Sequence, residues 1–205
     1  MLKRIGVYGG TFDPVHLGHL AVVEAVREEA RLDLVLFVPN NRQPLKAQGP
    51  FATGNQRLCM LQVALADNPG FAVDDLELRH KGPSYTIATL SALRQVLPEA
   101  ALYFIMGADA AASLAAWRAP ERILQEFHPL VMTRAGWPDP DWVALESISA
   151  QARFLVQMIQ VPQIEIASSE IRRLVREGRS IRYLVPEGVR QIIEEKGLYA
   201  SADDL

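Results

Sequence analysis

Residues 9–19 read GGTFDPVHLGH, and this stretch decides the fold because it joins a predicted buried strand to a predicted amphipathic helix. The strand is expected over residues 5–8, and apolar residues at three- and four-residue spacing predict a helix over 17–30. Two glycines at the end of the strand allow a ligand to approach the backbone closely. The free N–H groups of the following helix favour an anion. The stretch therefore predicts a strand–loop–helix junction that binds phosphate.

Strand-like and helix-like segments alternate along the rest of the chain. Apolar runs predict strands at 34–38, 71–79 (a strand or strand pair), 101–106, 129–132 and 154–156, and periodicity or capping signals predict helices at 53–66, 86–96, 168–178 and 186–197. This order predicts an α/β, Rossmann-like, doubly wound and mostly parallel sheet with helices on both faces. We expect one domain over 1–205 with a small C-terminal helical segment at about 167–199. Ligands of such sheets bind at the carboxyl ends of the strands, where strand order reverses.

Charge and composition narrow the range of partners. The chain has 205 residues, with 21 basic and 24 acidic side chains, and its net charge of −3 provides no electrostatic footprint for nucleic acid. The single cysteine, Cys59, lies in an apolar run and is expected to be a buried small side chain. Neither a signal peptide nor an apolar stretch of about 20 residues is recognised, so a cytoplasmic protein without membrane partners is expected.

Two histidines give the junction its chemistry. His16 and His19 are three residues apart in the first turn of the predicted helix, so they project from one face, and Gly18 between them leaves room for a phosphate. Imidazoles can donate hydrogen bonds to phosphate oxygens or, when protonated, neutralise them. This suits phosphoryl or nucleotidyl transfer, in which catalysis is mostly positioning and charge stabilisation. The stretch matches neither a Walker A sequence nor the Gly-x-Gly-x-x-Gly fingerprint.

The stretch at 9–19 resembles the signature of bacterial nicotinate-nucleotide adenylyltransferases, in the wider His-x-Gly-His nucleotidyltransferase superfamily. The resemblance covers about residues 3–199. It implies a Rossmann-like fold and transfer of the adenylyl group of ATP to nicotinate mononucleotide, which gives deamido-NAD and pyrophosphate in NAD biosynthesis. The implied catalytic residues are His16, His19, Lys46 and Arg172; the implied ATP-binding residues are Gly9, Gly10, Thr11, Phe12, Gly18, Gly107, Asp109, Ser168 and Ser169; the implied mononucleotide-binding residues are Tyr85, Thr86, Trp117 and Arg134.

Three later segments carry this resemblance. Residues 39–46 are similar to the family's loop after the second strand, with Gln43 and Leu45 in place of its Pro and His and with Lys46 retained. Residues 84–86 match its Ser-Tyr-Thr element. Residues 166–172 resemble the superfamily's Ile-Ser-Ser-Thr-x-Ile-Arg motif, with Ala167 in place of the first Ser and Ser169 in place of Thr. The hydroxyls in the last two segments have a simpler alternative role as helix caps. Trp117 has the alternative of a core position, although its flat face suits stacking on a pyridine ring.

Several rival functions remain open at this point. Within the superfamily they are a pantetheine-phosphate adenylyltransferase and a cytidylyltransferase, and outside enzymes a non-catalytic nucleotide-binding module. The resemblance implies Mg²⁺ carried on ATP, without a carboxylate cage built by the protein. The acid or the amide mononucleotide, and a monomer or a homo-oligomer, are equally compatible with the sequence.

Overall fold

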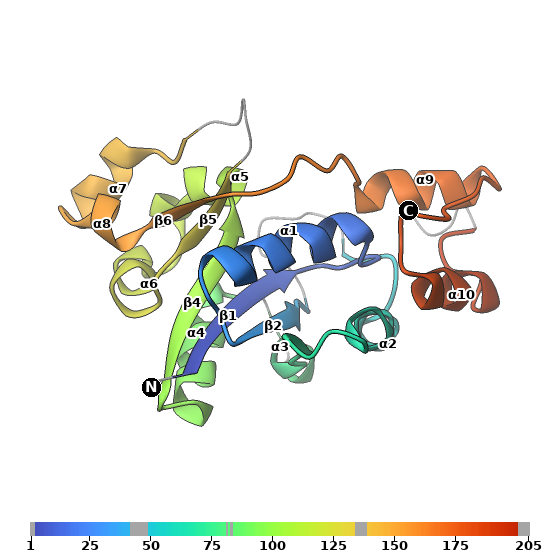
Figure 1. The fold of residues 1–205 in the computed structure, drawn as a ribbon, viewed down its shortest axis with the longest axis horizontal. Helices are drawn as coiled ribbons and strands as arrows, with labels where there is room; N and C mark the ends of the chain where they lie inside the picture. Colours follow the sequence, from blue (N-terminus) through green and yellow to red (C-terminus); the bar gives the residue numbers. More distant parts are fainter. Residues whose placement is uncertain (1–2, 42–48, 81, 83, 134–138, 201–205) are drawn as a thin grey trace. The chain divides into compact units, whose positions relative to one another are not determined.

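The computed structural model describes residues 3–41, 49–80, 82, 84–133 and 139–200. Within these ranges one six-stranded sheet has the order β3-β2-β1-β4-β5-β6 (Figure 1). The strands are β1 (Lys3–Gly10), β2 (Leu34–Pro39), β3 (Phe71–Val73), β4 (Ala100–Gly107), β5 (Leu130–Thr133) and β6 (Gln157–Gln160). All of them are parallel, so the predicted Rossmann-like α/β fold is confirmed. Strand order reverses between β1 and β4, where Tyr8 is paired with Ile105.

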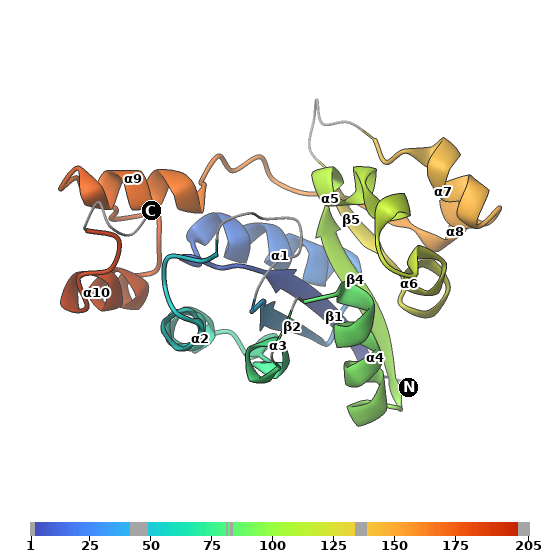
Figure 2. The same cartoon turned by 180° about the vertical axis from the view of Figure 1, so that it is seen from behind.

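Helices connect the strands and cover both faces of the sheet. They are α1 (Leu17–Glu29), α2 (Gly54–Leu65), α3 (Leu76–Arg79), α4 (Thr86–Val96), α5 (Ala108–Ala112), the 3-10 turn η1 (Leu114–Ala116), α6 (Pro120–Glu126), α7 (Trp142–Ile148), α8 (Ala152–Leu155), α9 (Ser168–Arg176) and α10 (Glu187–Glu195). Figure 1 shows α1 in front of β1, and Figure 2, from behind, shows α4 in front of β4. No helix of the described ranges combines the length and apolar character needed to cross a membrane.

The chain divides into two compact units, each built from three segments. The first unit contains Met1–Gly9, Glu24–Leu36 and Tyr85–Gln163. The second unit contains Gly10–Val23, Phe37–Ser84 and Ile164–Leu205. The second unit therefore brings the signature stretch together with the C-terminal helices, although more than half of the sequence separates them.

The core of the first unit explains why its strands are so apolar. Ile5, Val7, Leu102 and Ile105 are at most 3 % exposed, as expected for parallel strands covered on both faces. Full burial of each such side chain contributes about 1.5–3 kcal/mol. Gly6 is required by packing, because a Cβ there would lie 2.7 Å from Leu32 Cδ1 and 2.8 Å from Ile105 Cδ1.

Two predicted strands differ from the structure. The segment 71–79 forms β3 and then α3, because the Asp74 carboxylate accepts a hydrogen bond from the N–H of Leu76 at 2.8 Å and turns the chain. The strand predicted at 154–156 is wrong: Ala152–Leu155 is α8, Phe154 is 92 % exposed, and β6 begins at Gln157. The prediction failed because it took the apolar Phe154 for a buried strand residue, although its side chain is exposed. By contrast, the predicted capping box of Thr53 and Gln56 is confirmed at the start of α2.

Candidate functional site

The two histidines of the signature stretch (residues 9–19) cap the helix that follows. His16 directly precedes α1, and its Nδ1 accepts a hydrogen bond from the N–H of His19 at 3.2 Å. Nδ1 of His19 in turn accepts one from the N–H of His16 at 3.3 Å. This is the reciprocal arrangement of a capping box, built from imidazoles. The rings stack with centroids 3.6 Å apart. Since both Nδ1 atoms accept, each neutral ring has its proton on Nε2 and can donate that N–H to a ligand.

Burial keeps these rings neutral in the free protein. His16 is 5 % exposed, and its burial lowers its pKa to about 4. Burial lowers the pKa of His19 well below its ordinary value, and the charge of a protonated His16 would lower it further. At neutral pH both histidines are therefore uncharged hydrogen-bond donors. Positive charge for a polyanion must come from other side chains.

This burial predicts an acid-sensitive fold. Because the pKa of His16 is lower in the folded protein than in the unfolded chain, the unfolded chain binds more protons between pH 6.5 and 4. The free energy of unfolding should thus fall as pH drops through this window, by a His16 contribution approaching about 3 kcal/mol. Urea unfolding from pH 8 to pH 4 measures it.

A matched variant separates His16 from the other titrating groups. In His16→Asn the Oδ1 atom replaces the accepting Nδ1 without titrating in this range. The variant should lose less stability between pH 6.5 and 4 than the wild type. Identical slopes in the two proteins would show that His16 titrates normally and contradict its burial in the neutral form.

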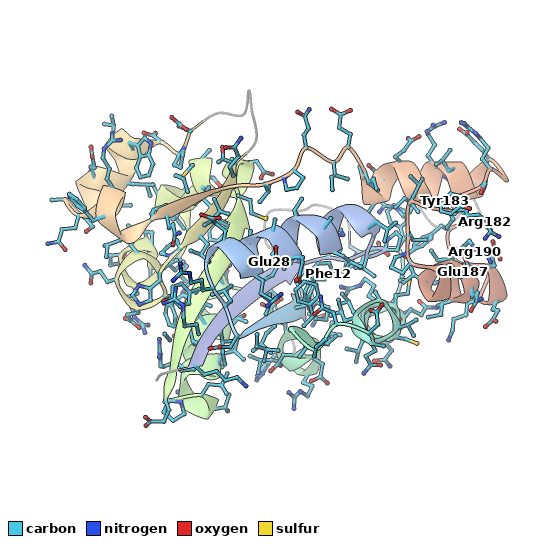
Figure 3. All side chains as sticks on the ribbon, viewed as in Figure 1. Phe12, Glu28, Arg182, Tyr183, Glu187 and Arg190 are labelled. Carbon is cyan, nitrogen blue, oxygen red and sulfur yellow. The ribbon has the colours of Figure 1, made fainter. Side chains whose placement is uncertain are left out.

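The glycines and Phe12 shape the turn in front of the histidines. A Cβ on Gly10 would lie 2.7 Å from the Phe12 ring, and a Cβ on Gly18 would lie 3.0 Å from His16 Nδ1. Phe12, labelled in Figure 3, is 1 % exposed and has a φ of 51°. Its ring centroid lies 5.3 Å from that of His19 and 5.7 Å from that of Phe37. Its side chain therefore belongs to the core, and only its backbone is available to a ligand. The space beside Gly18 is filled by the His16 ring.

The C-terminal motif packs directly against the signature stretch. The Ser168 hydroxyl donates to the carbonyl oxygen of Pro14 at 2.9 Å, and Arg172 Nη1 donates to the carbonyl oxygen of Asp13 at 2.6 Å. Ala167 holds the N-cap position of α9 without a side-chain cap, so a capping role for Ser168 and Ser169 is wrong. The structure thus brings together two groups of predicted site residues that lie about 150 residues apart, as a shared triphosphate site requires.

Arg172 brings a guanidinium to the turn that precedes the histidines. Its guanidinium lies over the Phe51 ring, 4.4 Å from the ring centroid, and it uses one nitrogen for Asp13. A guanidinium has five N–H donors in a fixed fork, so it can hold this carbonyl and still offer donors to a phosphate. The ring stacking and the carbonyl bond together define its orientation.

Sequence reasoning missed three buried residues behind this site: Asp13, Arg57 and Tyr199. Arg57 is 1 % exposed and donates from its three nitrogens to the carbonyl oxygens of Ala52, Thr11 and Asn40, at 3.3, 2.7 and 2.8 Å. The signal for Arg57 was its place among Met60, Leu61, Ala64 and Leu65 on the buried face of α2. A charged residue on an apolar face is a sign of a specific polar partner. No local signal marks the partners of Asp13 and Tyr199, which are considered below.

In the first unit, glycines end the two central strands. Gly9 and Gly107 lie near the carboxyl ends of the neighbouring β1 and β4. A Cβ on Gly107 would lie 2.7 Å from Asp109 Oδ1, so the glycine lets the carboxylate fold back over the end of the strand. The exposed Asp109 in the first turn of α5 remains accessible to a ligand hydroxyl, as expected for a ribose contact.

The residues expected to bind the mononucleotide also belong to the first unit. Tyr85 holds the N-cap position of α4 without a side-chain cap, and Ser84 instead accepts a hydrogen bond from the N–H of Asn41 at 3.2 Å. The alternative that Ser84 and Thr86 cap this helix is therefore wrong. The Arg118 guanidinium lies 5.0 Å from the Tyr85 ring centroid, a contact that sequence reasoning missed although Arg118 directly follows Trp117.

Trp117 has its own polar anchor. Its Nε1 donates to the Ser113 hydroxyl at 3.1 Å, and its ring centroid is 6.1 Å from that of Phe104. The side chain is half-buried, so it is neither a core tryptophan nor a fully exposed one. The remaining predicted site residues, Lys46 and Arg134, lie outside the described residues, as do Gln43 and Leu45. Within the described ranges no group of three or more His, Cys, Asp or Glu side chains could hold a metal ion.

Comparison with known proteins identifies the family. Residues 7–174 match the family model described as cytidylyltransferase-like. The chain is 42 % identical to a probable nicotinate-nucleotide adenylyltransferase of Rhodopirellula baltica over 198 residues, which is 95 % of this chain and 92 % of the relative. It is also 42 % identical to one of Thermomicrobium roseum over 205 residues, 98 % of this chain and 94 % of the relative.

Solved structures share the fold. A Plasmodium falciparum nicotinic acid mononucleotide adenylyltransferase complexed with NaAD superimposes with a TM-score of 0.76 at 20 % identity, over 96 % of this chain and 97 % of that one. A putative nicotinate-nucleotide adenylyltransferase from Vibrio parahaemolyticus gives 0.67 at 21 % identity, over 98 % and 97 %. With the signature stretch and the C-terminal motif in contact, these matches show that the chain belongs to the nicotinate-nucleotide adenylyltransferases of the cytidylyltransferase-like family.

Proposed function

We propose that this chain transfers the adenylyl group of ATP to nicotinate mononucleotide, releasing pyrophosphate and forming deamido-NAD for NAD biosynthesis. One observation supports this above the others. The stacked imidazoles of His16 and His19 lie in the N-terminal part of the chain, and the guanidinium of Arg172 lies in the C-terminal part. The bond from Arg172 to the Asp13 carbonyl oxygen brings these groups together around residues 13–19. Such a group of donors matches a triphosphate better than it matches a single phosphate.

The reaction needs no base from the protein. A phosphate oxygen of the mononucleotide attacks the α-phosphorus of ATP, the new P–O bond forms, and the bond to the β-phosphate oxygen breaks, so that pyrophosphate leaves with the electron pair. The attacking phosphate is already anionic. The protein must instead reduce repulsion between two polyanions and stabilise the charge that develops on the leaving group.

Neutral and charged side chains are proposed to bind the phosphates in different ways. His16 and His19 donate neutral Nε2–H groups, which bind phosphate oxygens without the cost of desolvating a cation. Arg172 adds a positive charge and the fork geometry suited to phosphate. The N-termini of α1 and α9 add partial positive charge. We place the adenosine end of ATP near Gly107 and Asp109, and Lys46 at a phosphate.

The mononucleotide is assigned to the first unit on chemical grounds. The N-terminus of α4, at Tyr85 and Thr86, favours the nicotinate carboxylate, and the half-buried Trp117 offers a face to the pyridine ring. Arg134 is proposed to border this site. Mg²⁺ is proposed to arrive as part of Mg–ATP, held by phosphate oxygens. We further propose a single cytoplasmic nucleotidyltransferase domain that binds neither nucleic acid nor membrane, as a monomer or a homo-oligomer.

Pyrophosphate release tests the substrate assignment. The purified chain with Mg–ATP should release pyrophosphate with nicotinate mononucleotide, and more slowly with nicotinamide mononucleotide, because the amide lacks the charge that the helix N-terminus favours. Phosphopantetheine with ATP, and CTP with nicotinate mononucleotide, serve as controls for the rival enzymes and should give no release. Faster turnover with either control pair, or none with any mononucleotide, would contradict the proposal.

A further inference from the structure

Asp13 is an unexpected residue beside a site for polyanions. It is 3 % exposed, and its oxygens accept four hydrogen bonds from within the second unit. Oδ1 accepts from the N–H of Ala52 at 3.1 Å and from the Tyr199 hydroxyl at 2.8 Å, and Oδ2 accepts from the N–H of Phe51 at 2.7 Å. The backbone oxygen accepts from Arg172. Three of the roughly four acceptor positions of this buried carboxylate are used inside the protein, so we expect it to act on the site through its neighbours.

Tyr199 makes this arrangement span the chain. It lies 186 residues from Asp13, just after α10, and is 3 % exposed. Burial, followed by the neighbouring Asp13 charge and the bond to it, raises the pKa of the Tyr199 hydroxyl far above its usual value. The hydroxyl therefore stays protonated and donates to Asp13 throughout the working pH range. A buried charge-assisted hydrogen bond of this kind contributes more than a neutral one.

Two arginines lie near Asp13: Arg172 donates to its backbone oxygen, and the charge of Asp13 acts on Arg57. Arg57 donates hydrogen bonds to the carbonyl oxygens of Thr11 and Ala52. It thereby links the same two chain segments that the Asp13 carboxylate links. The charge of Asp13 favours the protonated form of Arg57, whose pKa burial alone would lower further. The nearby positive charge of Arg57 thus lowers the cost of burying the Asp13 charge, without a direct bond between the two side chains among the described contacts.

We infer that Asp13 and Tyr199 are positioning residues for adenylyl transfer. The hydrogen bonds of the Asp13 carboxylate hold the turn at 11–14 against residues 51–52 and, through Tyr199, against the C-terminal segment. They thereby set the positions of His16, His19 and Arg172. Asp13 is three residues before His16 and is bonded to Arg172, so a shift of the turn moves both groups of donors. A displacement of about 1 Å in such groups can cost up to about a hundredfold in rate. The inference rests on the proposed function for its activity readout.

Tyr199→Phe is the sharpest test, because it removes one hydroxyl and preserves the buried ring. We expect kcat of the folded variant to fall about tenfold, while KM for ATP changes less than about threefold, since positional precision matters most in the transition state. Tyr183→Phe is the matched control: Tyr183 is 81 % exposed and lies beside Arg182, Glu187 and Arg190 at the start of α10 (Figure 3). It should leave both constants unchanged.

A purely structural role would give a different pattern. The melting temperature of Tyr199→Phe would then fall while kcat per folded molecule stayed at the wild-type value, and this result would overturn the inference. Wild-type pyrophosphate release, measured first, tests the proposed function separately from the ratio of variant to wild type. If the wild type gives no release, the proposed function fails and this inference falls with it; if the wild type is active and Tyr199→Phe matches it, only the inference fails.

A double variant tests whether the two residues act through one bond. Asp13→Asn should lower kcat more than Tyr199→Phe, because its amide N–H would face the N–H of Phe51 or that of Ala52, a donor where an acceptor stood. If the bond between them carries the effect, the double variant should be no slower than Asp13→Asn alone. Multiplied losses would show two independent roles and contradict the inference. Should Asp13→Asn not fold, the Tyr199→Phe result decides alone.

Discussion

Replacement of His19 by alanine is expected to lower kcat for pyrophosphate release at least about a hundredfold, the scale observed when a donor to a transition-state charge is removed. The reason is the fixed direction of the ring. Nδ1 of His19 accepts from the N–H of His16, which fixes the direction of the ring and of its Nε2–H bond. Steady-state kinetics with Mg–ATP and nicotinate mononucleotide measure the effect.

Two further substitutions separate chemistry from capping. His19→Asn keeps an acceptor for the N–H of His16 but has no group at Nε2, so its kcat should fall as far as that of His19→Ala while its stability stays closer to the wild type. His128→Ala is the control, since His128 is exposed and precedes the amino end of β5. Near-normal kcat in His19→Asn would mean that the ring serves the helix alone.

Arg172→Ala is expected to raise KM for ATP about thirtyfold, which corresponds to about 2 kcal/mol for a lost hydrogen bond to a charged group. Arg172→Lys should recover part of this, because an ammonium keeps the charge but cannot hold the Asp13 carbonyl and a phosphate in one fork. ATP titrations of the initial rate give both values. Arg173→Ala is the control on the same helix, as Arg173 is paired with Glu170 and Glu177.

The melting temperature shows whether Arg172 acts on ATP or on the fold. Arg172 is half-buried, and its loss leaves the Asp13 carbonyl one donor short, so a decrease of a few degrees is expected. A collapse of the folded state in Arg172→Ala, with unchanged KM in the folded fraction, would make this arginine a structural residue. The proposed triphosphate site would then lose Arg172 as its source of positive charge.

Much of the fold followed from the sequence because its signals are local. Continuous apolar runs ended by Gly or Pro marked β1, β2 and β4, and Thr53 with Gln56 marked the start of α2. The errors arose where an apolar run did not reflect burial. Phe154 is exposed on α8, whereas β6 carries two exposed glutamines and gives no apolar run of its own.

The sequence predicts those site residues that lie close together in the chain. It does not predict contacts between residues that are far apart in the chain. His16 and His19 are neighbours in sequence, and the C-terminal motif is found by resemblance. The tautomers and neutrality of the histidines depend on burial and on reciprocal bonds that only the structure shows. The partners of Asp13 lie 38 to 186 residues away, so no sequence pattern connects them.

A crystal structure of the chain with Mg²⁺ and a non-hydrolysable ATP analogue tests the central claim most directly. We predict that phosphate oxygens of one analogue molecule lie within about 3.2 Å of Nε2 of His16 or His19 and also of the Arg172 guanidinium. A triphosphate bound elsewhere, or held by only one of these two groups with the other left facing solvent, would contradict the account.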